Sequence, residues 1–218
     1  MLFAQFAFIP SVIGLFAQGG PDQLFTQSTY IPVAIGLFGL GTGYFIWGGQ
    51  VLLDYPKPSP EVDRTMGMWA FWMPGFMQFI TGVYLFVGLT WFQVFTKTPP
   101  LYMAALAFTA YGIHWFAMAH RRFIGSSVLP DAFMAIAFAI LSILGVVVFF
   151  AAGDWPVALV FVGLSLIYLS EAPTRFAVIP LLLGTRLVAL WQVLTGIWLM
   201  YLTWAFTLNI ALGMKLPV

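Results

Sequence analysis

Apolar residues occur along this chain in long runs, and the short stretches between the runs carry nearly all of the charged residues. About 20 consecutive apolar residues are needed to cross a membrane as a helix, and a helix satisfies its own backbone hydrogen bonds there. The pattern predicts an all-α polytopic membrane protein. Its six-transmembrane-helix bundle is expected near residues 32–53, 67–95, 101–119, 132–152, 155–171 and 187–211.

The N-terminal segment is less simple to interpret. Residues 2–17 are apolar, but the segment is short and Pro10 interrupts it. Because no lysine or arginine precedes it, we do not expect a cleaved signal peptide. We expect an interfacial or partly inserted helix, and a seventh membrane span is the alternative. The predicted organisation is an apolar N-terminal segment and linker over 1–30 and a transmembrane domain over 31–218.

Composition excludes several classes of protein. Hydrophobic residues make up 62% of the chain and charged residues 7%, whereas a soluble domain has roughly 25% charged residues. A net charge of +1 gives no reason to expect nucleic acid binding, and there is no cysteine. The two histidines, His114 and His120, lack the i, i+4 spacing of a metal pair on a helix. We expect no enzyme activity, no metal and no cofactor.

Membrane orientation depends on the number of spans. With six spans and a cytoplasmic N-terminus, the inner segments would carry only Lys97 and Lys215. The positive-inside rule therefore favours an external N-terminus, or seven spans with an internal one. The basic residues that would otherwise lie outside are Lys57, Arg64, Arg121, Arg122, Arg175 and Arg186.

Polar side chains inside the predicted spans are costly and therefore informative. They recur at helical spacing, which places them on one face of each helix. Because they are mostly neutral, they suit a path for small polar solutes, although they could also bond neighbouring helices. The polar positions are Gln78 and Thr81 in the second helix, Tyr111 and His114 in the third, Tyr168 in the fifth, and Gln192 and Thr195 in the last.

Residues 107–112 (AFTAYG), followed by Trp115, resemble the Ala-Phe-Thr-x-Tyr-Gly-x-x-Trp signature of the acetate uptake transporters, the succinate–acetate permeases. Residues 32–41 (PVAIGLFGLG) are similar to the first-helix motif of that family. The resemblance extends in order over roughly residues 31–211. Further matching positions are Gly75, Gln78, Gly82, Tyr201, Leu202, Leu208 and Asn209.

The resemblance implies a homohexamer in the plasma membrane, in contact with lipid, with one pore in each six-helix subunit. It also implies passage of small monocarboxylates such as acetate through a narrow hydrophobic constriction. The family's phenylalanine, tyrosine and leucine at that constriction correspond to Leu40, Tyr111 and Leu164. The residues expected to line the pore beside them are Gln78, Thr81, Thr109, His114 and Tyr168.

The chain departs from the family pattern at several positions. Ile31 and Ala34 replace an asparagine and a proline of the first motif, and Leu85 and Phe206 replace acidic residues. The substrate therefore stays open, and a channel for urea or amides is one alternative. A structural subunit of a larger membrane assembly that passes no solute is another. If His114 takes up a proton, it would favour an anion and make uptake rise in acid.

Overall fold

The computed structural model describes residues 32–95 and 98–218. Within these two ranges the chain is helical and contains no strand, which confirms the all-α fold. The N-terminal segment of residues 1–30, with the interfacial helix expected at 2–17, lies outside the described residues. The helices are α3 (Val33–Leu53), α4 (Pro60–Ala70), the π-helical η1 (Phe71–Phe76), α5 (Met77–Thr90), α6 (Leu101–Ile124), α7 (Asp131–Ala151), α8 (Trp155–Arg175) and α9 (Leu181–Leu212).

Segments α4, η1 and α5 follow one another directly as one rod. The rod begins at Pro60, seven residues before the start expected at 67, because the Ser59 hydroxyl accepts a hydrogen bond from the Val62 amide at 3.2 Å. Such a cap with proline in the first turn is a strong helix start. The rod ends at Thr90 rather than at 95. Pro74 lies within η1, and π-helical turns accommodate such interruptions of an α-helix.

Three of the later helices extend beyond the ends that the hydropathy pattern predicts from the charged residues. Helix α6 continues past 119 and includes Arg121 and Arg122 in its last turn, where the helix dipole favours cations. Helix α8 continues from 171 to Arg175, which forms an i, i+4 ion pair with Glu171 at 3.1 Å. Helix α9 begins at Leu181 rather than 187. These charges are paired or near helix ends, so the helices tolerate them.

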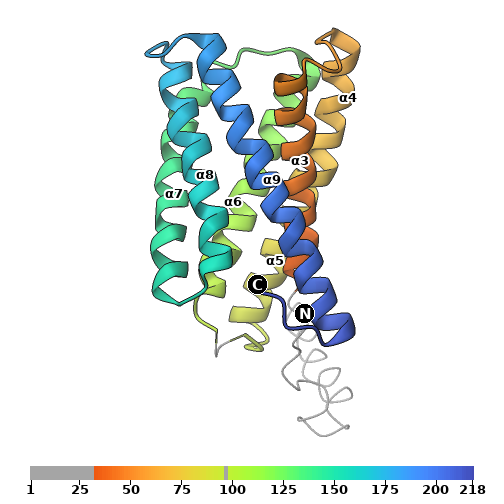
Figure 1. The fold of residues 1–218 in the computed structure, drawn as a ribbon, viewed down its shortest axis with the longest axis vertical. Helices are drawn as coiled ribbons and strands as arrows, with labels where there is room; N and C mark the ends of the chain where they lie inside the picture. Colours follow the sequence, from red (N-terminus) through yellow and green to blue (C-terminus); the bar gives the residue numbers. More distant parts are fainter. Residues whose placement is uncertain (1–31, 96–97) are drawn as a thin grey trace, which may run out of the picture.

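The helices run along the length of the bundle (Figure 1), and their contacts form a closed ring in which α6 also touches α7. Helix α3 packs against α9 on one side and against η1 and α5 on the other; α8 lies between α7 and α9, and α6 packs against α4, η1 and α5. Gly43 permits one of these approaches, because a Cβ there would lie 2.6 Å from Cγ of Pro74 in η1. The ring places the inward faces of α3, α6, α8 and α9 around a shared interior.

Five helical rods in the described part are long and apolar enough to cross a membrane, so the chain is a multi-pass membrane protein. They are Pro60–Thr90, Leu101–Ile124, Asp131–Ala151, Trp155–Arg175 and Leu181–Leu212. Helix α3 has 21 residues, six of them glycine, and is not among the five. The expected sixth span therefore stays a prediction at α3.

Candidate functional site

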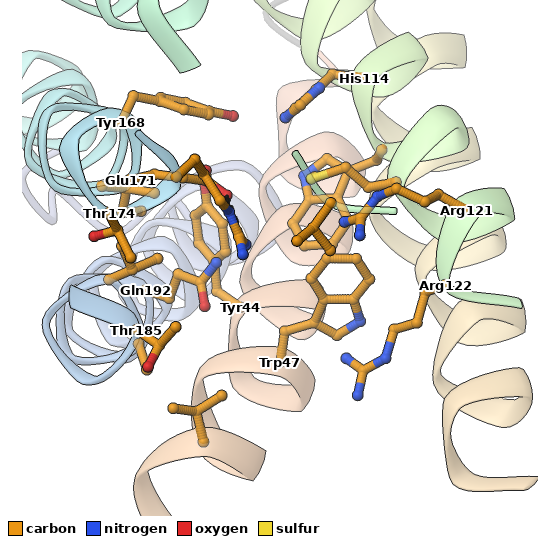
Figure 2. Close-up of a pocket in the computed structure, with 18 of the residues that line it drawn as sticks. Tyr44, Trp47, His114, Arg121, Arg122, Tyr168, Glu171, Thr174, Thr185 and Gln192 are labelled. Carbon is orange, nitrogen blue, oxygen red and sulfur yellow. Dashed lines mark hydrogen bonds and ion pairs between the residues drawn. The ribbon is translucent and has the colours of Figure 1, made fainter. Parts of the chain in front are cut away.

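One cavity of about 340 Å³ lies at the end of the bundle where α3, α6 and α8 finish and α9 begins. We call it the charged cavity, because three arginines and two carboxylates line it (Figure 2). Its walls come from four of the inward helix faces. Among its lining residues are Tyr44, Trp47, Asp63, His114, Trp115, Arg121, Arg122, Tyr168, Glu171, Arg175 and Gln192.

Each arginine of the charged cavity is paired with a carboxylate. Arg175 lies 3.1 Å from Glu171, and Arg121 lies 2.9 Å from Asp131 at the start of α7. Ion pairing is what makes charge tolerable in a partly buried site, because an isolated charge there loses its hydration. The network thus keeps charged groups at the wall of the cavity without leaving one alone.

Arg122 of α6 contacts both α3 and α4. Its guanidinium donates to Asp63 of α4 at 2.8 Å and to the side-chain oxygen of Gln50 of α3. It also lies over the ring of Trp47, 5.0 Å from the ring centroid, a geometry in which the ring face attracts a cation. These contacts hold the α3, α4 and α6 walls of the charged cavity in place.

A second cavity of about 180 Å³ lies toward the opposite end of the bundle. We call it the apolar cavity, since aliphatic and aromatic side chains dominate its wall. After α9, the chain turns back toward it: the Asn209 side chain donates to the Leu216 carbonyl and accepts from the Leu216 amide, both at 2.8 Å. Val218 then reaches the wall of the apolar cavity.

Asp154 is an acidic group at the edge of the apolar cavity. It lies between α7 and α8, and its carboxylate accepts from the Val157 amide at 3.1 Å as the cap of α8. Partial burial raises the pKa of Asp154, and the hydrogen bond from Val157 offsets part of that rise. This carboxyl is therefore more easily protonated than an exposed aspartate.

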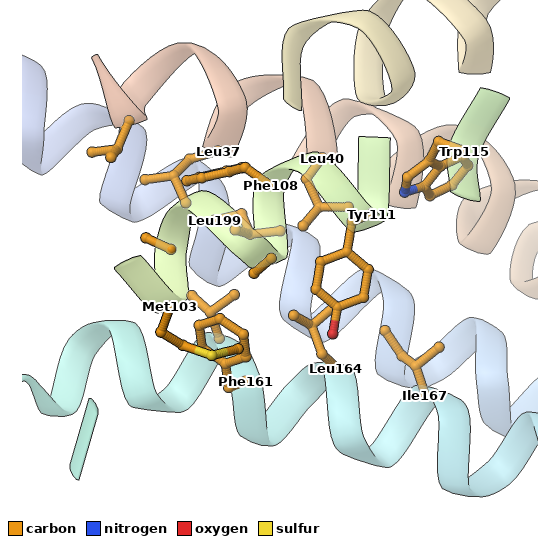
Figure 3. Packing of buried hydrophobic residues seen from close by; sticks show 14 of the residues in the cluster. Leu37, Leu40, Met103, Phe108, Tyr111, Trp115, Phe161, Leu164, Ile167 and Leu199 are labelled. Atoms are coloured by element: carbon orange, nitrogen blue, oxygen red, sulfur yellow. The ribbon is translucent and has the colours of Figure 1, made fainter. Parts of the chain in front are cut away.

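The two cavities share no lining residue, yet they approach within one helical turn of each other on three helices. One turn of an α-helix rises about 5.4 Å. We call Leu40, Tyr111 and Leu164 the barrier; they are 3%, 2% and 1% exposed and meet in the interior (Figure 3). On α3 the lining of the apolar cavity ends at Leu40 and that of the charged cavity begins at Tyr44. The corresponding residues are Tyr111 and His114 on α6, and Leu164 and Ile167 on α8.

A hydrogen bond to α7 holds the ring of Tyr111. The Tyr111 and Ser142 hydroxyls lie 2.7 Å apart, and Ser142 donates to the Phe138 carbonyl at 2.6 Å. Because a serine hydroxyl has one hydrogen, Tyr111 must be the donor to Ser142. The Tyr111 ring also stacks on Tyr168, with centroids 6.0 Å apart. The position of the barrier tyrosine is therefore set by α7 and α8.

His114 faces the charged cavity from α6. Its ring stacks on Phe138 with centroids 4.3 Å apart, and the side chain is 4% exposed. Neither ring nitrogen has a hydrogen-bond partner in residues 32–95 and 98–218. A buried imidazole without a partner is unusual, which makes His114 a candidate contact for a solute.

The remaining predicted pore residues divide into two groups. Gln78 lines the apolar cavity and donates to the Pro74 carbonyl at 2.9 Å, and Tyr168 lines the charged cavity. Thr81 and Thr109 line neither cavity; their hydroxyls donate to the carbonyls four residues earlier, at 2.7 and 2.8 Å. These two threonines lie at helix contacts in this structure.

Sequence reasoning missed Tyr44 and Ser142. Tyr44 follows Leu37 and Leu40 at spacings of seven and four, so the barrier leucine and Tyr44 share a face of α3. Ser142 is a lone hydroxyl in the middle of α7, whose other residues after Asp131 are apolar. A polar residue isolated in a spanning helix is a usable signal, but it does not reveal the partner.

Comparison with known proteins identifies the fold. The solved structure of the bacterial acetate channel SatP superimposes with a TM-score of 0.65 at 18% sequence identity, covering 88% of this chain and 99% of that chain. No protein-family model and no curated protein sequence matches. The chain therefore has the fold of that channel, as the resemblance of its motifs implies.

Proposed function

We propose that this protein is a channel or secondary transporter for small monocarboxylates such as acetate. The solute would pass between the charged cavity and the apolar cavity, across the barrier of Leu40, Tyr111 and Leu164. The observation that carries the proposal is the approach of two cavities from opposite ends to within one turn on α3, α6 and α8. The fold, shared with a bacterial acetate channel, supports the same reading.

The barrier suits a small solute that loses part of its hydration. A hydrophobic constriction resists the passage of water and of hydrated ions. Polar groups adjoin it on either side, His114 and Tyr168 in the charged cavity and Gln78 in the apolar cavity. Such groups replace part of the water that the solute gives up.

We further propose a homohexamer in the plasma membrane. Many large apolar side chains on the outside of the bundle are exposed in the single chain, among them Phe133, Ile140 and Trp204. Such a surface fits lipid or neighbouring subunits. The basic residues Arg121 and Arg175 lie at the same end of the bundle as the charged cavity, so the positive-inside rule favours the cytoplasm for this end. Native mass spectrometry of the purified protein measures the subunit number.

Uptake of labelled acetate into proteoliposomes tests the function. We expect saturable uptake above that of protein-free liposomes, and we expect Leu164→Ala to raise it by widening the barrier. Labelled urea is the neutral comparison solute, and Leu169→Ala, at an exposed position on the same helix, is the matched control. If urea is taken up and acetate is not, the substrate is a small neutral solute and not a monocarboxylate. Uptake of neither solute would refute the channel.

A further inference from the structure

The charged cavity contains a cluster of buried polar groups, most of them hydrogen-bond donors, that have no partner among the described residues. The Tyr44 hydroxyl, both nitrogens of His114 and the indole nitrogen of Trp115 are buried and lack a partner among the described residues. These three side chains are 2%, 4% and 1% exposed. All three line the charged cavity, directly beside the barrier. We call Tyr44, His114 and Trp115 the donor cluster.

The donor cluster is compact and comes from two helices. The rings of Tyr44 and Trp115 have centroids 5.8 Å apart, and His114 precedes Trp115 in α6. The indole nitrogen of Trp47 is also buried and has no partner within the described part of the chain, and its ring centroid lies 4.9 Å from that of Trp115. In Figure 2, His114 and Tyr168 point toward each other across the cavity. Their ring centroids are 5.8 Å apart.

An unpaired buried donor is costly, so a cluster of them indicates a ligand that accepts hydrogen bonds. An indole nitrogen can only donate, and an imidazole has at least one N–H in either protonation state. We propose that the donor cluster is a binding site for the carboxylate group of a small monocarboxylate, next to the barrier on the side of the charged cavity. This assignment rests on the proposed function.

The charges around the cluster are compatible with an anion. Both carboxylates that line the cavity are in ion pairs, Glu171 with Arg175 and Asp63 with Arg122. Three arginines against two carboxylates line the wall, and the third arginine, Arg121, pairs with Asp131 at 2.9 Å. The bound anion therefore meets polarised N–H and O–H groups without a free carboxylate to repel it.

A carboxylate fits the cluster better than an amide does. Its two oxygens accept several hydrogen bonds and donate none, which matches a site made mostly of donors. An amide would bring two N–H groups that need acceptors. Hydrogen bonds to a charged acceptor are also about twice as strong as those between neutral groups. The cluster should therefore distinguish acetate from acetamide, which has nearly the same shape.

Isothermal titration of the detergent-solubilised full chain with sodium acetate, and separately with acetamide, tests the site. Tyr44→Phe removes one hydroxyl and leaves the ring in place. Tyr84→Phe is the matched control, because Tyr84 lies on α5 with 48% of its surface exposed. We expect acetate to bind the wild type and to bind Tyr44→Phe at least about tenfold more weakly, the effect of one lost hydrogen bond to a charged group. We expect Tyr84→Phe to match the wild type and acetamide to bind less tightly than acetate.

The result separates this inference from the proposed function. Equal acetate affinity in Tyr44→Phe and the wild type, no acetate binding by the wild type, or acetamide binding as tight as that of acetate would each overturn the binding site. If proteoliposomes show acetate uptake while the titration gives one of these results, only the site is wrong. If acetate binds as expected but is not taken up, the site stands and the transport function fails.

Discussion

The hydrogen bond between Tyr111 and Ser142 offers a way to loosen the barrier without changing any residue of it. Ser142→Ala removes the acceptor, and the side chain of Ser142 lies in α7, outside both cavities. The Tyr111 ring stays in place only through its packing against neighbours such as Phe138, whose ring centroid is 5.1 Å away. We expect the variant to pass acetate faster than the wild type.

The magnitude follows from the geometry. Ser142 already donates to the Phe138 carbonyl at 2.6 Å, so the variant loses one neutral hydrogen bond and leaves the Tyr111 hydroxyl without its acceptor. A bond of this kind contributes about 1 kcal/mol net. If that free energy favours the closed position of the ring, its loss raises the open population about fivefold, since about 1.4 kcal/mol corresponds to tenfold.

Initial rates of labelled acetate uptake in proteoliposomes, at equal protein content, measure the change. Ser165→Ala is the matched control, because Ser165 is buried too but donates only to the Phe161 carbonyl of its own helix, at 2.8 Å. We expect up to about a fivefold increase for Ser142→Ala and none for Ser165→Ala. Equal rates in the two variants would refute the view that this hydrogen bond holds the barrier closed.

Three further predictions concern packing and titration. Gly82→Ala should destabilise the protein by about 1–3 kcal/mol, because its Cβ would lie 2.6 Å from the backbone nitrogen of Thr109. Gly49→Ala is the control, because its Cβ would have nothing within 4 Å, and it should be neutral or stabilising. Thermal unfolding measures both variants. Acetate uptake above that of protein-free liposomes should rise in acid and rise less in the His114→Ala variant; identical pH profiles would exclude a proton role. Asp154→Asn keeps a good helix cap, and because burial raises the pKa of Asp154, the ionised carboxyl costs stability at neutral pH. The variant should melt higher than the wild type at pH 7 but not at pH 3; an equal or lower melting temperature at pH 7 would contradict this.

The helices were predictable from hydropathy, but several of their ends were not. Runs of apolar residues place six helical rods correctly in order, because a spanning segment must be long and apolar whatever its neighbours are. Helix α6 continues to Ile124 and helix α8 to Arg175, because the arginines near these ends pair with carboxylates, and helix α9 begins at Leu181. The pattern of charges along the chain does not contain these partners, so it placed the boundaries too early or too late.

The candidate site was likewise predictable only in part from the sequence. Helical spacing put Tyr111 and His114 on one face of α6, and the structure places one in each cavity, a turn apart. Thr81 is three residues from Gln78 and Thr109 was expected from the family resemblance, yet the hydroxyls of both threonines bond to their own helices and line neither cavity. Periodicity identifies a face of a helix, and only packing decides whether that face meets a cavity or another helix.

The sequence by itself determined that this is a helical membrane protein. It also showed which polar residues lie inside the spanning helices, where burying them costs free energy and therefore indicates a structural or functional role. Both follow from the free energy of moving groups out of water, which each residue carries with it wherever the chain folds. Tertiary structure alone decided that Tyr44, His114 and Trp115 share one cavity and that Ser142 accepts from Tyr111. Those contacts join residues of different helices, and their distances depend on how the helices pack.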